Sequence, residues 1–352
     1  MSYKDGMSAL NLEMSKRVPR TEYSVHCHWE LVKKVTGIDV DNSKSQEIHQ
    51  KAISAFLKAW NFDIFWATYI HAGIFGELRT KMGHAEYATG GVDYSPEVSC
   101  PFKSPEEVLD FDPWQAYGKI DKAKIAKEFE NHNNSQKLLY PDTVTMTGIY
   151  DTCISGLIDI FGFEMMLLGA GTDIARFGEM TNRYCSWIQQ YFDALAQADV
   201  PVVMVHDDIV WTSGPFLPPD WFRKYVFPNY KKFMEPLKSS GKKILFTSDG
   251  DYTAFLDDVV SCGADGVVME PSTDMKYFAE KYGKTHSFVG NADTRVLLYG
   301  TKEEIRSEVQ RCMDIGKKCP GFIMAVGNHI PSNTPIENAL YYNEVYEELS
   351  KR

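Results

Sequence analysis

The second half of the chain alternates short, almost wholly apolar runs with longer segments in which apolar residues recur every three or four positions. Such apolar runs are typical of strands in a parallel sheet that is covered on both faces. The intervening periodicity predicts amphipathic helices. The predicted strands of this half are residues 201–206, 243–248, 266–270, 287–290 and 321–326. Strand and helix therefore alternate, which favours an α/β fold.

Two more apolar runs, at residues 62–68 and 143–147, predict strands in the first half of the chain. An amphipathic pattern predicts one long helix from Asp173 to Gln197. This number of strands, with helices between them, indicates a (β/α)8 TIM barrel with one irregular element. The sequence has neither a GxGxxG nor a Walker A motif, which counts against an open, nucleotide-binding sheet.

The remaining segments of the first half determine the expected domain organisation. Residues 1–58 precede the first predicted strand, and we expect them to form a helical arm that closes one end of the barrel. Residues 59–352 would then form the catalytic TIM-barrel domain. Residues 83–134 are rich in Gly, Pro and Asp, which predicts an irregular insertion between the first two strands.

The composition of the chain argues against certain binding partners. The chain has 37 Lys and Arg against 48 Asp and Glu, a net charge of −11 with His neutral. Such an acidic balance argues against nucleic acid or an anionic membrane as a partner. The first residues are polar and lack the apolar core of a secretion signal, and the seven cysteines include no CxxC pair. We therefore expect a cytoplasmic protein with reduced thiols.

Each predicted strand of the second half ends in polar residues, and active sites of TIM barrels lie at these strand ends. Asp208, Asp251 and Asp293 are good helix N-caps, so capping explains each of them singly as well as chemistry does. Histidine and glutamate are poor caps, so the set as a whole indicates a site. Its predicted catalytic residues are His206, Asp207, Asp249 and Glu270.

Aromatic residues at the end of the first predicted strand suit a flat, apolar substrate. Tyr69 and His71 lie at the strand exit, whereas core packing is the stronger interpretation for Trp66. His28, in the N-terminal arm, is expected either to reach the barrel mouth or to lie on the surface. Asn328, after the last predicted strand, completes the predicted substrate-binding set.

Four segments, in order along the chain, resemble the uroporphyrinogen decarboxylase-like superfamily. They contain HDDIVWTSGPFLPPDWFRKYVFP, ILFTSDGDY, FVGNADTR and GNHIPSNTP. VPRTEYSVHCHWELVKKVTG and the GNHIP segment are most similar to the corrinoid-dependent O-demethylase methyltransferases. The resemblance implies a TIM barrel that moves a methyl group from a methoxylated aromatic compound to the Co(I) corrinoid of a partner protein, the first step of O-demethylation. It also implies a homodimer.

The sequence departs from two other branches of this superfamily. The decarboxylases share an arginine-bearing segment near the N-terminus, but residues 24–29 contain no arginine. Thr68 or Tyr69 also replaces their key Asp. Thiol-activating members bind zinc through a His-x-Cys motif and a later Cys, and this chain has Thr247, Asp249 and Asn328 at those positions. A lyase of the decarboxylase type is therefore the weaker alternative.

Two further alternatives stay open. A methyltransferase that uses a methylamine or a thioether would favour an aromatic cage, which Trp66, Tyr69 and Trp211 could supply. A barrel kept as a binding protein is disfavoured by the polar clusters at the strand ends.

The leaving group decides which chemistry an aryl ether requires. An aryl oxide leaves poorly unless a proton donor or a Lewis-acid metal neutralises its charge. The O-demethylase resemblance implies zinc on an acidic residue, a Glu and a His separated by fourteen and twenty positions, which Asp293, Glu308 and His329 match. Glu308 lies in a predicted outer helix, where a salt bridge is the alternative role, so Glu270 is an alternative third ligand.

Overall fold

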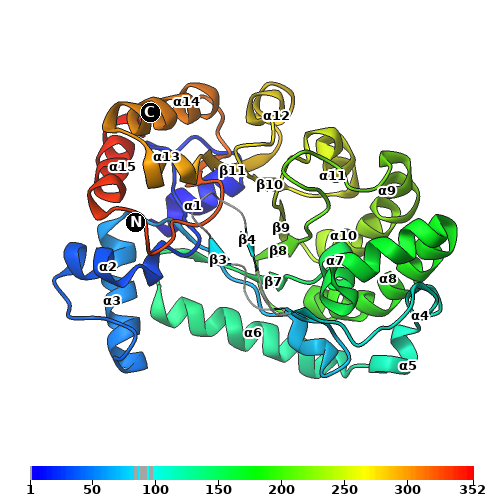
Figure 1. The fold of residues 1–352 in the computed structure, drawn as a ribbon. Coiled ribbons are helices and arrows are strands. Elements are labelled where there is room, and N and C mark those ends of the chain that lie inside the picture. The colour runs from blue at the N-terminus through cyan, green and yellow to red at the C-terminus, as the bar shows by residue number, and fades with distance from the viewer. Residues whose placement is uncertain (1, 83–85, 88–92, 95–97) are drawn as a thin grey trace.

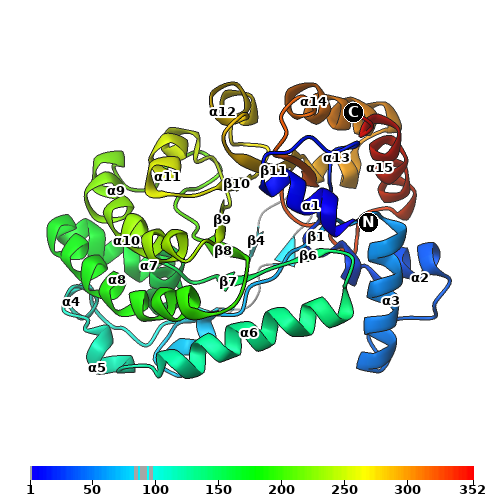
Figure 2. The same ribbon diagram turned by 180° about the vertical axis from the view of Figure 1, so that it is seen from behind.

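Parallel strands follow one another around a barrel, and the connecting helices surround them (Figures 1 and 2). The computed structural model describes residues 2–82, 86–87, 93–94 and 98–352. Six strands form one parallel sheet: β7 (Thr147–Ile149), β8 (Val202–His206), β9 (Lys243–Ser248), β10 (Gly266–Met269), β11 (Ser287–Ala292) and β12 (Phe322–Val326). β6 (Val144–Thr145) directly precedes β7 and pairs in parallel with β1 (Ile64–Phe65). The predicted (β/α)8 barrel is confirmed.

The N-terminal segment closes the wall of the barrel between β12 and β1. The Met324 N–H donates to the Pro19 carbonyl (2.8 Å), and the Thr21 N–H donates to the Met324 carbonyl (3.1 Å). On the other side, the Asp63 N–H donates to the Arg20 carbonyl (2.9 Å). Residues 19–21 therefore occupy the eighth position of the wall, which is the irregular element that the sequence pattern left unassigned.

The side chain of Arg20 holds this segment in place. Its guanidinium is fully buried and lies 4.5–5.0 Å from the ring centres of Trp60, Tyr342 and Tyr346. It forms an ion pair with Glu22 at 3.1 Å. A buried charge is tolerated only when it is paired and hydrogen-bonded, so these contacts specify where the segment lies.

Helix α1 (Tyr3–Leu10) covers the N-terminal end of the barrel. Its Ala9 and Leu10 belong to the same buried cluster as interior side chains of the strands, such as Val202 and Val289. A Cβ atom on Gly6 would lie 2.5 Å from the Asp63 carbonyl oxygen, so only glycine allows this close approach. One end of the barrel is thereby closed, and the opposite end carries the cavities.

The outer helices follow the expected strand–helix alternation. The predicted helix from Asp173 to Gln197 is confirmed as α8 (Ile174–Gln197), with Asp173 as its N-cap. The others are α7 (Ile154–Thr172), α9 (Pro219–Tyr225), α10 (Phe227–Ser239), α11 (Leu256–Cys262), α12 (Met275–Tyr282), α13 (Thr294–Tyr299), α14 (Lys302–Gly316) and α15 (Ile336–Leu349). Within the described part of the chain, α7 alone is long and apolar enough to cross a membrane, and 61% of its most apolar window is buried in the fold, as in a core helix.

The N-terminal region contributes α2 (Trp29–Thr36) and α3 (Gln46–Ala59) beside the barrel (Figure 1). The expected irregular insertion at residues 83–134 is wrong over its second half, where α4 (Pro105–Leu109), α5 (Pro113–Tyr117) and most of α6 (Lys122–Leu139) form. Part of its first half lies outside the described residues. Short strands lie just before and within this first half: β2 (Lys81–Met82) pairs with β5 (Val98–Ser99), and β3 (Glu86–Tyr87) pairs with β4 (Asp93–Tyr94).

Candidate active site

The carboxyl ends of the strands bring polar side chains to the open end of the barrel. His206 is the last residue of β8, Asp249 follows β9, Glu270 follows β10, and Asn328 lies shortly after β12. Two cavities lie above these strand ends, one of about 260 Å³ and one of about 680 Å³. Asp249 and Asn328 line both of them, so the cavities adjoin.

The smaller cavity is largely aromatic. The ring of Tyr150 stacks on the imidazole of His206, with 3.8 Å between ring centres and 12° between planes. The rings of Tyr23 and Trp66 are in contact at 4.9 Å. Met204, which belongs to the cluster inside the barrel, also lines the cavity. Flat, mostly apolar walls of this kind suit a planar ring.

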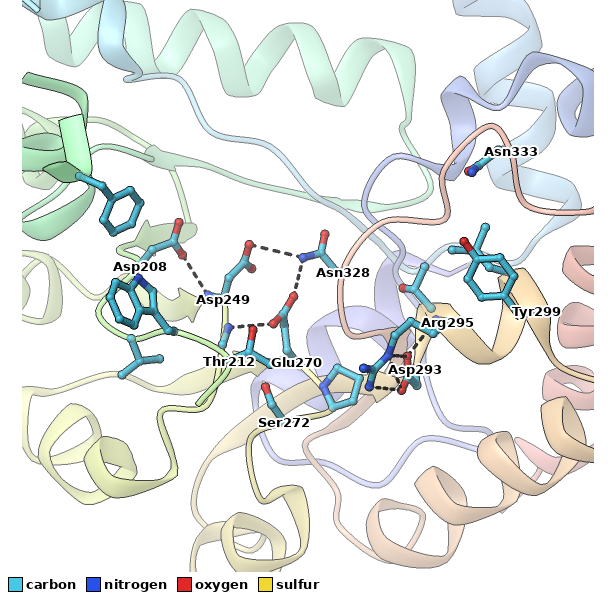
Figure 3. A pocket seen from close by; sticks show the side chains of 17 residues that line it. Asp208, Thr212, Asp249, Glu270, Ser272, Asp293, Arg295, Tyr299, Asn328 and Asn333 are labelled. Atoms are coloured by element: carbon cyan, nitrogen blue, oxygen red, sulfur yellow. Dashed lines mark hydrogen bonds and ion pairs between the residues drawn. The ribbon is translucent and has the colours of Figure 1, made fainter. Parts of the chain in front are cut away.

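The larger cavity is wider and more acidic (Figure 3). Four of its lining residues are carboxylates, and its lining also includes Arg295, which is paired with one of them, Asp293, at 2.7 Å. The side chains of Phe163 and Trp211, at its edge, are exposed. Its volume falls within the range of about 300–1,000 Å³ that is usual for ligand sites.

His206 is oriented by one hydrogen bond and one ion pair. Its Nδ1 lies 3.1 Å from the Tyr150 carbonyl oxygen, which can only accept, so Nδ1 carries a proton. Its Nε2 lies 3.3 Å from Asp208 Oδ1. Burial lowers the pKa of His206, but the charge and hydrogen bond of Asp208, and then the charge of Asp249, outweigh it and raise the pKa to about 9. The imidazole is therefore a cation near neutral pH.

Asp208 belongs to the site, and sequence reasoning missed it in favour of Asp207. Successive residues of an extended strand point to opposite sides, so His206 and Asp208 share a side, and Asp207 does not. The Asp207 carboxylate instead accepts the backbone N–H groups of residues 153–155, at the start of α7, and the Tyr230 hydroxyl. The two-residue period of the strand was the signal that could have distinguished the two aspartates.

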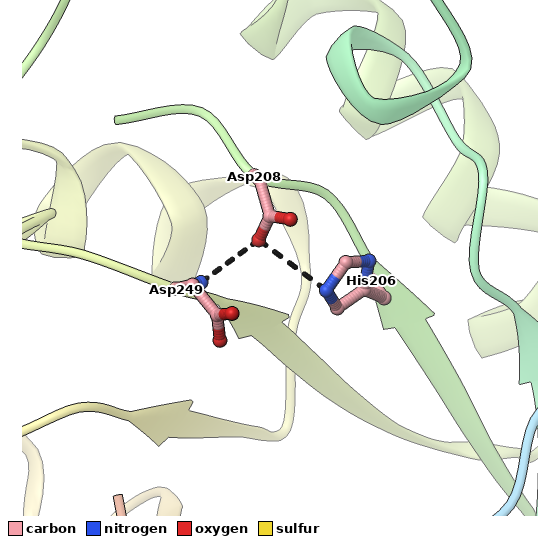
Figure 4. Close-up of side chains that lie close together, drawn as sticks. All are labelled: His206, Asp208 and Asp249. Atoms are coloured by element: carbon pink, nitrogen blue, oxygen red, sulfur yellow. Dashed lines mark hydrogen bonds and ion pairs between the residues drawn. The ribbon is translucent and has the colours of Figure 1, made fainter. Parts of the chain in front are cut away.

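An amide and two backbone N–H groups connect the carboxylates (Figures 3 and 4). Asn328 Nδ2 donates to Glu270 Oε1 (2.5 Å) and to Asp249 Oδ2 (3.4 Å). The Gly250 N–H donates to Glu270 Oε2 (2.8 Å), and the Asp249 N–H donates to Asp208 Oδ1 (2.9 Å). The structure thus brings together three of the predicted catalytic residues, namely His206, Asp249 and Glu270.

The predicted substrate-binding residues divide between the cavity and the scaffold. Trp66, His71 and Asn328 line the smaller cavity. Tyr69 lies outside both cavities: its hydroxyl donates to Glu128 Oε2 (3.3 Å), and its ring packs against a helix outside the barrel. His28 caps α2 by accepting the Leu31 N–H on Nδ1, and its Nε2 contacts the carbonyl of Thr334. The lining residues that were not predicted include two aromatic ones, Tyr23 and Tyr150.

The predicted zinc ligands Asp293, Glu308 and His329 are not brought together. Asp293 is the N-cap of α13, and its carboxylate is paired with an arginine of that helix. Glu308 lies on α14, where it pairs with Arg311 (2.7 Å) and accepts the Asp293 backbone N–H. His329 Nδ1 contacts the Ser24 hydroxyl at 2.7 Å. In the described part of the chain, the ligand atoms of these three residues are therefore not gathered around one point.

A different group has the geometry of a metal site. Within the described part of the chain, one set of at least three His, Cys, Asp or Glu residues has ligand atoms that all lie within 4.8 Å of one another. It consists of His206, Asp208 and Asp249 (Figure 4). We call these three residues the His-Asp-Asp group.

Known proteins resemble this chain at three levels. The sequence pattern of the family described as Uroporphyrinogen decarboxylase (URO-D) matches residues 115–349. The uroporphyrinogen decarboxylase of Carboxydothermus hydrogenoformans is 30% identical over 172 residues, 49% of this chain and 47% of that protein. That of Geobacter sulfurreducens is 28% identical over 163 residues, 46% of each chain. The matched segment thus spans about half the length of these relatives.

The fold also has a close counterpart among solved structures. A methyltransferase from Methanosarcina mazei superposes with a TM-score of 0.63 and 17% sequence identity, and the match covers 99% of each chain. At this identity the likeness concerns the fold. The superfamily resemblance inferred from the sequence is confirmed.

Proposed function

Because the chain belongs to the uroporphyrinogen decarboxylase family and has the fold of a methyltransferase, we propose that it transfers a methyl group from a methoxylated aromatic compound to the Co(I) corrinoid of a partner protein. Family and fold indicate an enzyme of methyltransferase or decarboxylase type. We propose three further points: methyl transfer as the reaction, an aryl ether as the methyl donor, and a corrinoid protein as the acceptor.

One observation carries the proposal: an aromatic cavity adjoins a cluster of ionisable groups and opens beside a wider cavity. A methoxylated ring would lie against Tyr150 and Trp66, with its ether oxygen toward the His-Asp-Asp group. The wider cavity would leave room for a bulky corrin to approach the methyl carbon. In this arrangement the aryl ether and the corrin would enter through different cavities, and the cobalt would reach the methyl carbon where the cavities adjoin.

The chemistry then follows from the leaving group. Co(I) attacks the methyl carbon in line, a cobalt–carbon bond forms, and the carbon–oxygen bond breaks with its electron pair left on the aryl oxygen. The His-Asp-Asp group would neutralise that developing charge, either by giving a proton from His206 or by holding a cation. Stabilisation of charge where it develops is the largest single contribution in many enzymes.

The charge of the cavities disfavours a decarboxylase. A porphyrinogen with several carboxylates requires several basic partners, ideally arginines. Among the described residues that line the two cavities, one is arginine and none is lysine, whereas four are carboxylates. The lone arginine, Arg295, is already paired with Asp293. A polyanionic substrate would therefore be repelled.

A methyl-transfer assay tests the proposal. The purified chain would be mixed under anaerobic conditions with free cob(I)alamin and, separately, with methoxybenzoates, methoxyphenols, trimethylamine or dimethyl sulfide. We expect methylcobalamin to form with the aryl ethers and not with the amine or the sulfide. Release of CO2 from uroporphyrinogen III, without methyl transfer from any aryl ether, would reject the proposal and support the lyase.

The setting of the reaction is part of the same proposal. All seven cysteines are free thiols, which suits a reducing cytoplasm, and reduced cobalt requires such an environment. We expect a homodimer, as the superfamily implies, and sedimentation of the purified chain would test that expectation.

A further inference from the structure

We propose that the His-Asp-Asp group is a zinc site at the boundary between the two cavities. The ligand atoms of His206, Asp208 and Asp249 all lie within 4.8 Å of one another, and they come from the adjacent ends of β8 and β9. The site itself is independent of the proposed function, but the role that we assign to it below rests on that function.

The donor set fits zinc better than it fits magnesium or calcium. Zinc accepts imidazole nitrogen and carboxylate oxygen, and catalytic zinc sites keep three protein ligands with one open position. Magnesium and calcium prefer ligand sets made of oxygen alone. One imidazole nitrogen and two carboxylate oxygens are donors that zinc accepts, and three protein ligands leave a fourth position open.

Neighbouring groups already orient each ligand. The Nδ1–H of His206 donates to the Tyr150 carbonyl, which leaves Nε2 for a metal. Asp208 accepts the Asp249 backbone N–H, and Asp249 accepts from the Asn328 amide. A histidine ligand that is held through its other nitrogen by a carbonyl is a regular feature of zinc sites.

A second observation points independently to a ligand at this position. Thr247 is 2% exposed, and its Oγ1 has no hydrogen-bond partner among the described residues, although the residue lines the smaller cavity. It lies opposite His206 in the β8–β9 register and two residues before Asp249, so it shares their side of the strand. A buried hydroxyl is normally satisfied. A zinc-bound water or a substrate oxygen would provide its partner.

The position of the site determines what zinc would do there. Asp249 lines both cavities, so a zinc ion held by this group would lie where the two cavities adjoin, beside the proposed place of the ether oxygen. Zinc uptake replaces the proton on His206 Nε2, which is released to solvent. In the proposed methyl transfer, a zinc ion held by His206, Asp208 and Asp249 would supply Lewis-acid stabilisation of the negative charge that develops on the aryl oxygen.

Metal analysis of the whole chain and of matched variants tests the ligand set. Protein purified from zinc-containing medium and dialysed should hold about one zinc per chain by elemental analysis. Its cobalt(II)-substituted form should show the intense visible bands of four-coordinate cobalt. Asp208→Asn and Asp249→Asn should each weaken zinc binding by at least about tenfold, with unchanged circular dichroism. Glu308→Gln, from the ligand set that the sequence spacing implied, is the control and should keep its zinc.

The outcomes separate the site from its role. Zinc that is absent from the wild-type chain, or that is retained in Asp249→Asn and lost in Glu308→Gln, overturns the site. Zinc on the His-Asp-Asp group, with no methyl transfer from any donor, supports the site and rejects the proposed function. Methyl transfer that persists at full rate after the zinc has been removed overturns the catalytic role.

Discussion

Asp151 provides a quantitative test of the electrostatics near the site, because the residue is almost fully buried, at 1% exposure, and its charge interacts with that of His206. Burial, and next the neighbouring carboxyl of Asp159, raise its pKa from 3.8 to about 9. At neutral pH the folded chain therefore holds a proton that the unfolded chain releases. Such a group lowers stability as pH rises from the unfolded pKa to the folded pKa.

The size of the effect follows from linkage. One extra proton bound in the folded state lowers the free energy of unfolding by about 1.4 kcal/mol per pH unit. Asp151→Asn removes that dependence without changing the shape of the side chain. The free energy of unfolding of the variant should therefore rise relative to that of the wild type as pH rises. The difference between the two free energies should grow by about 4 kcal/mol from pH 5 to pH 8.

Urea unfolding followed by tryptophan fluorescence at several pH values measures this difference. Asp142→Asn, which removes an exposed carboxylate, is the matched control and should follow the wild-type pH dependence. Parallel curves for Asp151→Asn and the wild type would refute the reasoning, because they would mean that Asp151 binds no extra proton in the folded chain.

Three further predictions concern the scaffold and the smaller cavity. Asp207→Ala should lower the free energy of unfolding by at least about 3 kcal/mol, because buried donors, including the Tyr230 hydroxyl, lose their acceptor; an unchanged urea midpoint would contradict this structural role. Gly6→Ala should cost about 1–3 kcal/mol, since its Cβ would meet the Asp63 carbonyl, and an unchanged melting temperature would show that α1 can shift freely. Trp66→Ala should raise KM for a methoxyarene more than it lowers kcat, and an unaltered KM would place the ring elsewhere.

Much of the barrel could be predicted from the sequence, because strands buried on both faces are continuous apolar runs. Residues 19–21 also form part of the barrel wall, but they are not an apolar run and were therefore not predicted. They include Arg20, whose charge is compensated by Glu22 and by aromatic rings far along the chain, and no local pattern reveals such partners. Helix α6 was missed because its buried positions, such as Phe129 and Asn133, are few and partly polar.

The site was predictable to the extent that strand ends determine it. His206, Asp249 and Glu270 follow from their places at the carboxyl ends of β8, β9 and β10. Tyr69 was predicted from its place at a strand exit and His28 from the expected reach of the N-terminal arm, whereas side-chain direction and a capping hydrogen bond decide where they lie. The spacing of Asp293, Glu308 and His329 in the sequence did not predict where their side chains lie, because Asp293 pairs with Arg295 of α13 and Glu308 pairs with Arg311 of α14.

The central claim is that the His-Asp-Asp group neutralises the departing aryl oxide. Its most direct test is the rate of methyl transfer to cob(I)alamin from a series of aryl methyl ethers whose phenols differ in acidity. The wild-type rate should depend only weakly on the acidity of the phenol, whereas the rate of Asp249→Asn should fall steeply as the phenol becomes a weaker acid. The same slope for both proteins would contradict the claim.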